Sequence, residues 1–249
     1  MEDNMARTDL GPHASFGGGG DRHKPRQPTP HRPVILVHGI TNTASNFAKI
    51  REFFNTHGYR DFEVYATTYG DGGKTNAIMF TMNCHYMKIL RSFIQVVADY
   101  TSSKVNIIGY SMGSPVARKA IMGGVCVDTG EQLGPPLTHL VHTFVSVAGA
   151  NFGSFLCVLP FGSCNMNNGL GCGSSFLNDI NSRGRYEGQR VFSIYSTGDD
   201  KVGYQACGTI TSNVPGQDAA FPLNEMNHDQ VMLNTAQLQY NLVTFGRPA

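Results

Sequence analysis

The sequence lacks several features that would assign it to particular classes of protein. It contains no tryptophan, and charged residues make up only 15% of its 249 residues, with 19 Lys and Arg against 18 Asp and Glu. This balance gives no basic face of the kind found on proteins that bind nucleic acid, so we expect no nucleic-acid partner. No apolar run approaches the length of about 20 residues that a transmembrane helix needs, so we expect no membrane-spanning segment.

Metal-binding patterns are lacking as well. The cysteines and histidines show no Cys-x-x-Cys pair and no finger-type spacing. His139 and His142 are three residues apart, but an extended strand places side chains at that spacing on opposite faces. We therefore predict no bound metal and no cofactor.

The cysteines are even in number, and they are Cys84, Cys126, Cys157, Cys164, Cys172 and Cys207. Without metal-binding spacing, they favour disulfide bonds in an oxidising compartment, with free buried thiols as the alternative. Their spacing does not select one pairing. The chain begins Met1-Glu2-Asp3-Asn4, shows no secretory signal peptide and has no glycosylation sequon. We expect an extracellular protein whose signal peptide has been removed from this chain, the alternative being a compartment that is not oxidising.

What the sequence does contain is a regular alternation of short apolar runs with amphipathic stretches. Strands are predicted at residues 33–40, 62–66, 105–108, 140–147 and 191–195, with a short last one at 218–223. Helices are predicted at residues 45–57, 79–101, 114–122 and 228–242. This alternation is typical of an α/β protein with a mainly parallel sheet of about six strands and helices on both faces.

Two segments fall outside this alternation. Residues 1–32 contain Gly17 to Gly20 and several prolines, so we predict a flexible N-terminal arm ahead of a domain at 33–249. Residues 149–189 are rich in Gly, Asn and Ser, hold three cysteines and show no sustained period. A loop of this length is usually functional, and its apolar residues would suit a wall over a site; a disulfide-stapled surface decoration is the alternative.

The central motif of the chain is Gly109-Tyr110-Ser111-Met112-Gly113. It follows a β-branched run at 105–108 and precedes the predicted helix at 114–122. A serine held at such a sharp turn has an exposed hydroxyl, and the flanking glycines let the strand and the helix pass closely. The context predicts a nucleophile elbow with Ser111 as the nucleophile; an ordinary turn that carries a serine is the alternative.

A serine nucleophile needs a base, and the base needs an orienting acid. In folds built around a nucleophile elbow the chain order is serine, acid, histidine. His228 is the one histidine after position 142, so we expect it to be the base. The strand at 191–195 leads into Asp199 and Asp200, and both qualify as the acid because parallel strands deliver them to the edge that carries Ser111. Spacing alone leaves this choice open.

Two backbone amides are expected to bind the oxyanion of the tetrahedral intermediate. One follows the nucleophile, at Met112, and the other lies in the loop after the first strand, where Ile40 is the natural choice. His38 precedes the serine, against the expected order, so we assign it a role in shaping that turn.

These motifs together resemble the class 2 lipase family, which comprises small α/β-hydrolases similar to the minimal lipases of bacilli and their cysteine-bearing animal relatives. The segments that carry the resemblance are Val37-His38-Gly39-Ile40, the elbow, Ile194 to Asp199, and Asn227-His228. The resemblance implies an α/β-hydrolase fold from about residue 33 onward. It also implies a catalytic triad of Ser111, Asp199 and His228, with Ile40 and Met112 as the oxyanion amides, and so favours Asp199 over Asp200.

The function that follows is hydrolysis of carboxylic esters, with triacylglycerols or other lipid esters as the expected substrates and transient contact with a lipid interface. A non-lipid carboxylesterase or an acyltransferase on the same triad is one alternative. A catalytically silent lipid-binding protein on a hydrolase scaffold is the other. The 149–189 insert is longer than the compact loop of the bacterial relatives, so it bears on chain-length preference.

Overall fold

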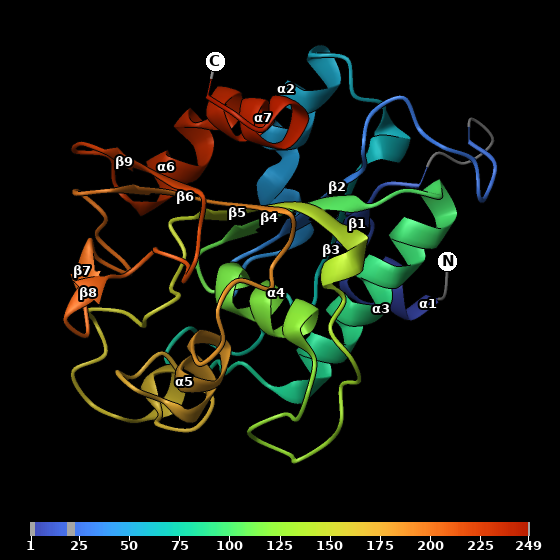
Figure 1. Ribbon diagram of the computed structural model, residues 1–249. Helices are drawn as coiled ribbons and strands as arrows, with labels where there is room; N and C mark the ends of the chain where they lie inside the picture. Colours follow the sequence, from blue (N-terminus) through green and yellow to red (C-terminus); the bar gives the residue numbers. More distant parts are fainter. Residues whose placement is uncertain (1–2, 19–22, 249) are drawn as a thin grey trace.

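A computed structural model describes residues 3–18 and 23–248. Its main feature is a seven-stranded sheet with the strand order β1-β3-β2-β4-β5-β6-β9, in which every neighbouring pair is parallel except β1 and β3 (Figure 1). The strands are β1 Ser15–Phe16, β2 Val34–Val37, β3 Val64–Thr67, β4 Val105–Tyr110, β5 Val141–Val147, β6 Arg190–Ser196 and β9 Ala219–Leu223. A separate two-stranded hairpin pairs β7 Gln205–Ala206 with β8 Thr209–Ile210.

Helices cover both faces of the sheet (Figure 1). The α-helices are α1 Asp3–Ala6, α2 Ala48–Thr56, α3 Cys84–Thr101, α4 Gly113–Met122, α5 Ser175–Asn181, α6 His228–Asn234 and α7 Ala236–Phe245. Short 3-10 turns are η1 Thr8–Leu10, η3 Ala44–Phe47, η4 Asp61–Glu63, η5 Thr138–Leu140 and η6 Gly162–Cys164. The predicted α/β architecture with a mainly parallel sheet is confirmed.

The core is divided by the sheet because successive strand residues point to opposite faces. In β2, Ile35 and Val37 pack into the cluster that holds α3, α4 and α5. Val34 and Leu36 pack into the cluster that holds α2, α6 and α7. All four side chains are buried, which explains why a central parallel strand reads as a continuous apolar run rather than as an alternating one.

Two predicted helices have different bounds in the structure. The helix predicted from residue 79 begins only at Cys84, after the extended residue Asn83. The helix predicted at 228–242 is two helices, α6 and α7, divided at Thr235. The Thr235 hydroxyl donates to the Val231 carbonyl at 2.6 Å, a local hydrogen bond that bends a helix in this way.

The structure differs from the expectation of a flexible arm over residues 1–32, of which 1–2 and 19–22 lie outside the described residues. Ser15–Phe16 add an antiparallel edge strand to β3. Arg7 donates through Nη1 to the Gly70 carbonyl at 2.6 Å. An open edge of β3 would leave its amides and carbonyls unpaired, and these contacts cover that edge.

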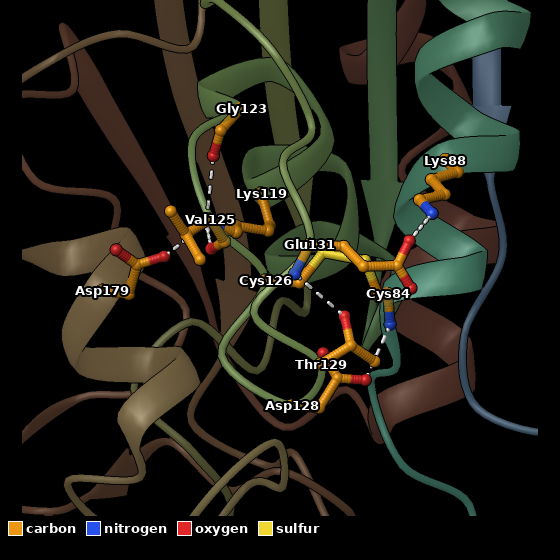
Figure 2. Close-up of a disulfide and its surroundings, with 10 residues drawn as sticks. All are labelled: Cys84, Lys88, Lys119, Gly123, Val125, Cys126, Asp128, Thr129, Glu131 and Asp179. Atoms are coloured by element: carbon orange, nitrogen blue, oxygen red, sulfur yellow. Dashed lines mark hydrogen bonds and ion pairs between the residues drawn. A yellow bond between two sulfur atoms is a disulfide. The ribbon is translucent and has the colours of Figure 1, made fainter.

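The six cysteines form three disulfides, Cys84–Cys126, Cys157–Cys164 and Cys172–Cys207, which confirms the disulfide prediction. Figure 2 shows that the first of these ties the start of α3 to the loop after α4. In that loop Asp128 Oδ2 accepts the Cys84 amide at 2.9 Å, and Lys88 pairs with Glu131 beside it. The sulfur atoms are bonded to each other, so this cluster offers no thiolate for a metal.

The insert at 149–189 is ordered by two of these disulfides and by α5. Helix α5, which the sequence analysis missed, is capped by Ser174, whose hydroxyl accepts the Leu177 amide at 3.3 Å. The Cys172–Cys207 bond fastens the insert to the β7–β8 hairpin. None of the helices described is both long and apolar enough to cross a bilayer.

Candidate active site

The turn between β4 and α4 holds Ser111 in a left-handed backbone conformation with φ of 56°. Such a conformation is strained for a residue with a side chain and is found at functional turns. The glycines on either side are required by close approach. A Cβ at Gly109 would lie 2.7 Å from Ser114 Cα, and a Cβ at Gly113 would overlap the carbonyl oxygens of Val37 and His38. The strand, turn and helix predicted around the motif are therefore present.

The loop after β2 lies against this turn. A Cβ on Gly39 would stand 2.9 Å from Ser111 Cβ and 3.3 Å from its Oγ, so only glycine allows the loop to come this close. The next residue, Ile40, and the residue after the serine, Met112, border the same cavity as Ser111. The structure thus places both predicted oxyanion residues beside the same cavity as Ser111.

His228 and Asp199 meet at the carboxyl edge of the sheet. Asp199 follows the end of β6, His228 begins α6 after β9, and both strands run parallel to β4. His228 Nδ1 lies 2.8 Å from Asp199 Oδ2, with only 2% and 1% of the two side chains exposed. A carboxylate at this position fixes the tautomer and the orientation of the imidazole.

Asp200, the alternative acid, has a different partner. Its Oδ1 accepts the backbone amide of His228 at 3.0 Å and makes no hydrogen bond to the ring. The first-turn amides of a helix have no partner within the helix, so Asp200 satisfies one of those donors at the start of α6. Of the two carboxylates, only Asp199 contacts the imidazole.

The charge state of Asp199 follows from its contacts. Burial by itself would raise its pKa, but the hydrogen bond and charge of His228 and the amides of Lys201 and Val202 hold the pKa below its usual value. Those amides donate to Asp199 Oδ1 at 3.0 and 2.9 Å, with Gly203 adding a third at 3.2 Å. Asp199 is therefore ionised at neutral pH and accepts the Nδ1 proton of His228.

Tyr110, the residue before Ser111, packs against His228, with ring centroids 5.0 Å apart. Within the described residues, Ser111 Oγ makes no hydrogen bond to a side chain, and Ser111 is one of the residues that line the cavity. Catalytic hydrogen bonds are often long in unliganded enzymes and tighten when substrate binds. Of the two contacts expected in the triad, the His228–Asp199 contact is present.

His38, which we expect to shape the turn after β2, is buried. Burial lowers its pKa to about 4, so the ring is neutral at physiological pH. A carbonyl cannot donate, so Nδ1 carries the proton and donates to the Gly39 carbonyl at 2.8 Å. The ring stacks on Tyr69 with centroids 4.2 Å apart, and these contacts hold the loop that approaches Ser111.

A cavity of about 440 Å³ opens beside Ser111. Its lining is mainly apolar and includes Ile40, Ala77, Ile78, Leu156, Val158, Leu159, Phe161, Leu170 and Val202. Five of these residues come from the 149–189 insert, so the insert forms a wall of the cavity rather than a decoration elsewhere on the surface. An apolar cleft with few polar groups is the usual form of a site for an apolar ligand.

One carboxylate beside the candidate site is missing from the sequence-based prediction. Asp229 accepts hydrogen bonds from Tyr110 and Lys201 next to the site. Its adjacency to His228 is the signal that could have drawn attention to it. Spacing could not reveal that a tyrosine and a lysine from two other segments converge on it.

Solved structures of lipases share this fold. The chain superposes on Aspergillus fumigatus lipase B with a TM-score of 0.63 at 14% identity, over 96% of this chain but only 56% of that one. The mature form of Bacillus licheniformis lipase BlEst2 gives 0.63 at 13% identity, over 92% and 97%. A Paleococcus ferrophilus monoacylglycerol lipase gives 0.54 at 12% identity, over 92% and 96%. At these identities the likeness establishes the α/β-hydrolase fold alone.

The family follows from the sequence over most of its length. The family model for Lipase (class 2) matches residues 31–241. This range includes the β4–α4 turn, Asp199 after β6 and His228 in α6, and the match confirms the resemblance that those motifs indicated. The chain therefore belongs to the class 2 lipase family of lipolytic hydrolases.

Proposed function

We propose that the protein hydrolyses carboxylic esters of lipids through an acyl-enzyme on Ser111. His228 takes the proton of the serine hydroxyl as Oγ attacks the ester carbonyl, and Asp199 orients the imidazole and stabilises its protonated form. The protonated His228 then gives its proton to the leaving alcohol. Water activated by His228 releases the carboxylic acid and restores the serine.

A single observation carries this proposal. Ser111 stands at a strained turn that opens on an apolar cavity, and the carboxyl ends of the neighbouring strands deliver a buried His228–Asp199 pair to the same edge. An α/β protein has no structural need for a buried His–Asp pair beside such a turn. The amides of Met112 and Ile40 are the proposed donors to the oxyanion.

The apolar cavity supports a lipid ester as the substrate. Around its mouth, large apolar side chains of the insert stand exposed, with Leu156, Val158, Leu159 and Phe161 at 58, 82, 62 and 55%. Exposed apolar patches of this kind mark sites that contact apolar partners. We propose that this rim makes transient contact with a lipid surface while an acyl chain enters the cavity. The three disulfides support an extracellular location.

The nucleophile is tested with Ser111→Ala. We expect this variant to lose hydrolysis of a short p-nitrophenyl ester by at least about 10³-fold while its thermal unfolding stays close to that of the wild type. Activity near the wild-type rate would refute the mechanism. Labelling by a fluorophosphonate probe separates an enzyme from a silent lipid-binding protein, because only an activated serine reacts.

The substrate class is tested with a panel that compares soluble esters with emulsified triacylglycerols, each with and without an alcohol acceptor. A lipase hydrolyses the emulsion efficiently. Preference for soluble esters would indicate a carboxylesterase, and ester formation with the alcohol in place of hydrolysis would indicate an acyltransferase.

A further inference from the structure

A single carboxylate joins the segments that surround the candidate triad. Asp229, the second residue of α6, accepts the Tyr110 hydroxyl on Oδ1 at 2.8 Å. Lys201 Nζ donates to both of its oxygens, at 2.9 Å to Oδ1 and 2.7 Å to Oδ2. Asp229 is adjacent to His228, so the side chain that receives both donors belongs to the turn that carries the histidine.

The two donors belong to the other two segments. Tyr110 immediately precedes Ser111, and Lys201 lies two residues after Asp199. We propose that Asp229, through Tyr110 and Lys201, is a positioning residue that holds the nucleophile, the acid and the base of the triad in one arrangement. This inference rests on the function proposed above.

The contacts of Tyr110 and Lys201 reach further than the carboxylate. The Tyr110 ring packs against the His228 ring, at an interplanar angle of 36°, so the link through its hydroxyl also holds a surface on which the imidazole lies. The Lys201 amide donates to Asp199 Oδ1, so this residue binds the acid through its backbone and Asp229 through its side chain. Breaking the contacts of Asp229 would therefore loosen both groups that hold the His228 ring, the Tyr110 ring and the Asp199 carboxylate.

Fold stability gives little reason for the arrangement. Asp229 and Lys201 are 56% and 53% exposed, and an ion pair at that exposure contributes little to fold stability. Tyr110, in contrast, is 2% exposed, and a buried hydroxyl needs an acceptor. The exposed ion pair is therefore explained better by placement of groups than by stabilisation of the domain, whereas the Tyr110 contact also satisfies a buried hydroxyl.

Tyr110 and Asp229 keep their charge states across the neutral range. Burial, followed by the bond to Asp229, raises the pKa of Tyr110 far above its usual value, so its hydroxyl stays a donor. Burial alone would raise the pKa of Asp229, but the hydrogen bonds from Lys201 and Tyr110 lower it, so it stays a carboxylate. The other titratable groups that face this contact are His228, which lies beside Asp229, and Asp199 and Asp200, which lie near Tyr110.

The central variant is Asp229→Asn, which removes the charge and keeps the shape. Because a positioning residue acts on the arrangement of reacting groups rather than on substrate affinity, we expect kcat for p-nitrophenyl butyrate to fall about tenfold with KM within about twofold of wild type. Tyr110→Phe keeps the ring and removes the hydroxyl, and we expect a smaller fall in kcat of the same kind. Lys201 also borders the cavity, so the kcat of Lys201→Met is compared with the kcat of Lys201→Arg. The arginine keeps the positive charge that binds Asp229 and should restore kcat.

The matched control is Asp61→Asn. Asp61 is 53% exposed and binds Arg51 at 2.8 Å and Asn55 at 2.9 Å, so it has the same number of side-chain partners as Asp229. It precedes the amino end of β3, whereas Ser111 follows the carboxyl end of the parallel strand β4, so the two lie at opposite edges of the sheet. We expect Asp61→Asn to leave kcat and KM within about twofold of the wild type. An equal fall in kcat in both variants would assign the effect to general loosening and overturn the proposal.

The link between donor and acceptor is tested with the double variant Tyr110→Phe with Asp229→Asn. If the two act through one contact, the double variant should lose no more than the worse single variant, instead of the product of the two losses. Fully multiplicative losses, or a kcat for Asp229→Asn within about twofold of wild type, would overturn the proposal.

A measurement that needs no substrate separates this proposal from the proposed function. Amide hydrogen exchange of residues 201–203, whose amides bind Asp199, should speed up in Asp229→Asn and stay unchanged in Asp61→Asn. Unchanged exchange together with unchanged kcat overturns the positioning role alone, and ester hydrolysis that depends on Ser111 still stands. A wild-type protein that is inactive on esters would overturn the proposed function. Faster exchange in Asp229→Asn would still show that Asp229 holds residues 201–203, whose amides bind Asp199.

Discussion

At the scale of single residues, the two neighbouring aspartates show what sequence can and cannot decide. Asp199 and Asp200 follow the same strand and have the same chemistry, so their spacing left both open. The structure separates them, because one carboxylate contacts the imidazole of His228 and the other contacts its backbone amide. The choice depends on side-chain directions within a turn, which no periodicity encodes.

The first prediction contrasts these aspartates. Asp199→Asn should reduce kcat/KM for a p-nitrophenyl ester by about 10³- to 10⁴-fold, because the imidazole loses the acceptor that sets its tautomer. Asp200→Asn keeps an oxygen that can accept the His228 amide and should cost less than about tenfold. Measuring both variants side by side decides the matter, and the reverse order would mean that the acid has been misplaced.

The second prediction concerns pH and stability. The pKa of Asp199 is lowered in the folded protein, so its ionised form contributes stability that is fully present above the unfolded pKa and is lost as pH falls through the folded pKa. The free energy of unfolding, measured with denaturant between pH 7 and pH 3, should therefore fall below about pH 4. In Asp199→Asn this fall should be shallower, and an identical pH profile in both proteins would contradict the assigned cause.

At the scale of elements, the β4–α4 turn was predictable because its sequence pattern is a steric requirement. A β-branched run followed by two glycines and a helix allows only a sharp strand-to-helix turn, and the structure contains that turn. Helix α5 was missed because its three buried residues, Phe176, Leu177 and Ile180, span too few turns to show a period. The break at Thr235 was missed because a single hydroxyl-to-carbonyl bond does not interrupt an apolar pattern.

The third prediction is that Gly113→Ala disrupts this turn. Its Cβ would overlap the backbone carbonyls of Val37 and His38, which cannot move without shifting β2. We expect the free energy of unfolding to fall by about 1–3 kcal/mol or more. Gly184→Ala is the control, since a Cβ there meets nothing within 4 Å. Equal stability of the two variants would show that the turn has room to relax.

At the scale of the whole molecule, the alternation of strands and helices predicted the layers, and the even number of cysteines predicted the disulfides. The pairing could not be predicted, because it depends on which loops the fold brings within about 6 Å of each other. The edge strand β1 was missed for a related reason. Ser15–Phe16 gain their conformation from β3, a partner about fifty residues away, and carry no strand signal of their own.

The fourth prediction compares two disulfides with different roles. Cys84–Cys126 closes a separation of 42 residues and Cys157–Cys164 closes one of 7. Chain entropy gives a loss of about 4 kcal/mol for replacing the first pair with serines and about 2 kcal/mol for the second, measured by denaturant unfolding. Only the second pair borders the cavity, so its loss should change the preference among ester chain lengths more than the first. Equal effects on chain-length preference would contradict this division.

The small ring closed by Cys157–Cys164 has a consequence for limited proteolysis. Val158 and Phe161 stand exposed inside it, so a protease that accepts large apolar residues can reach the backbone there. A single cut after Phe161 would place Ser111 on one fragment and Asp199 and His228 on the other. The Cys157–Cys164 bond would still join the two fragments, and the nicked protein would migrate as one species until it is reduced. Reduction would then leave no covalent bond between Ser111 and the His228–Asp199 pair, because the other two disulfides each lie within one fragment.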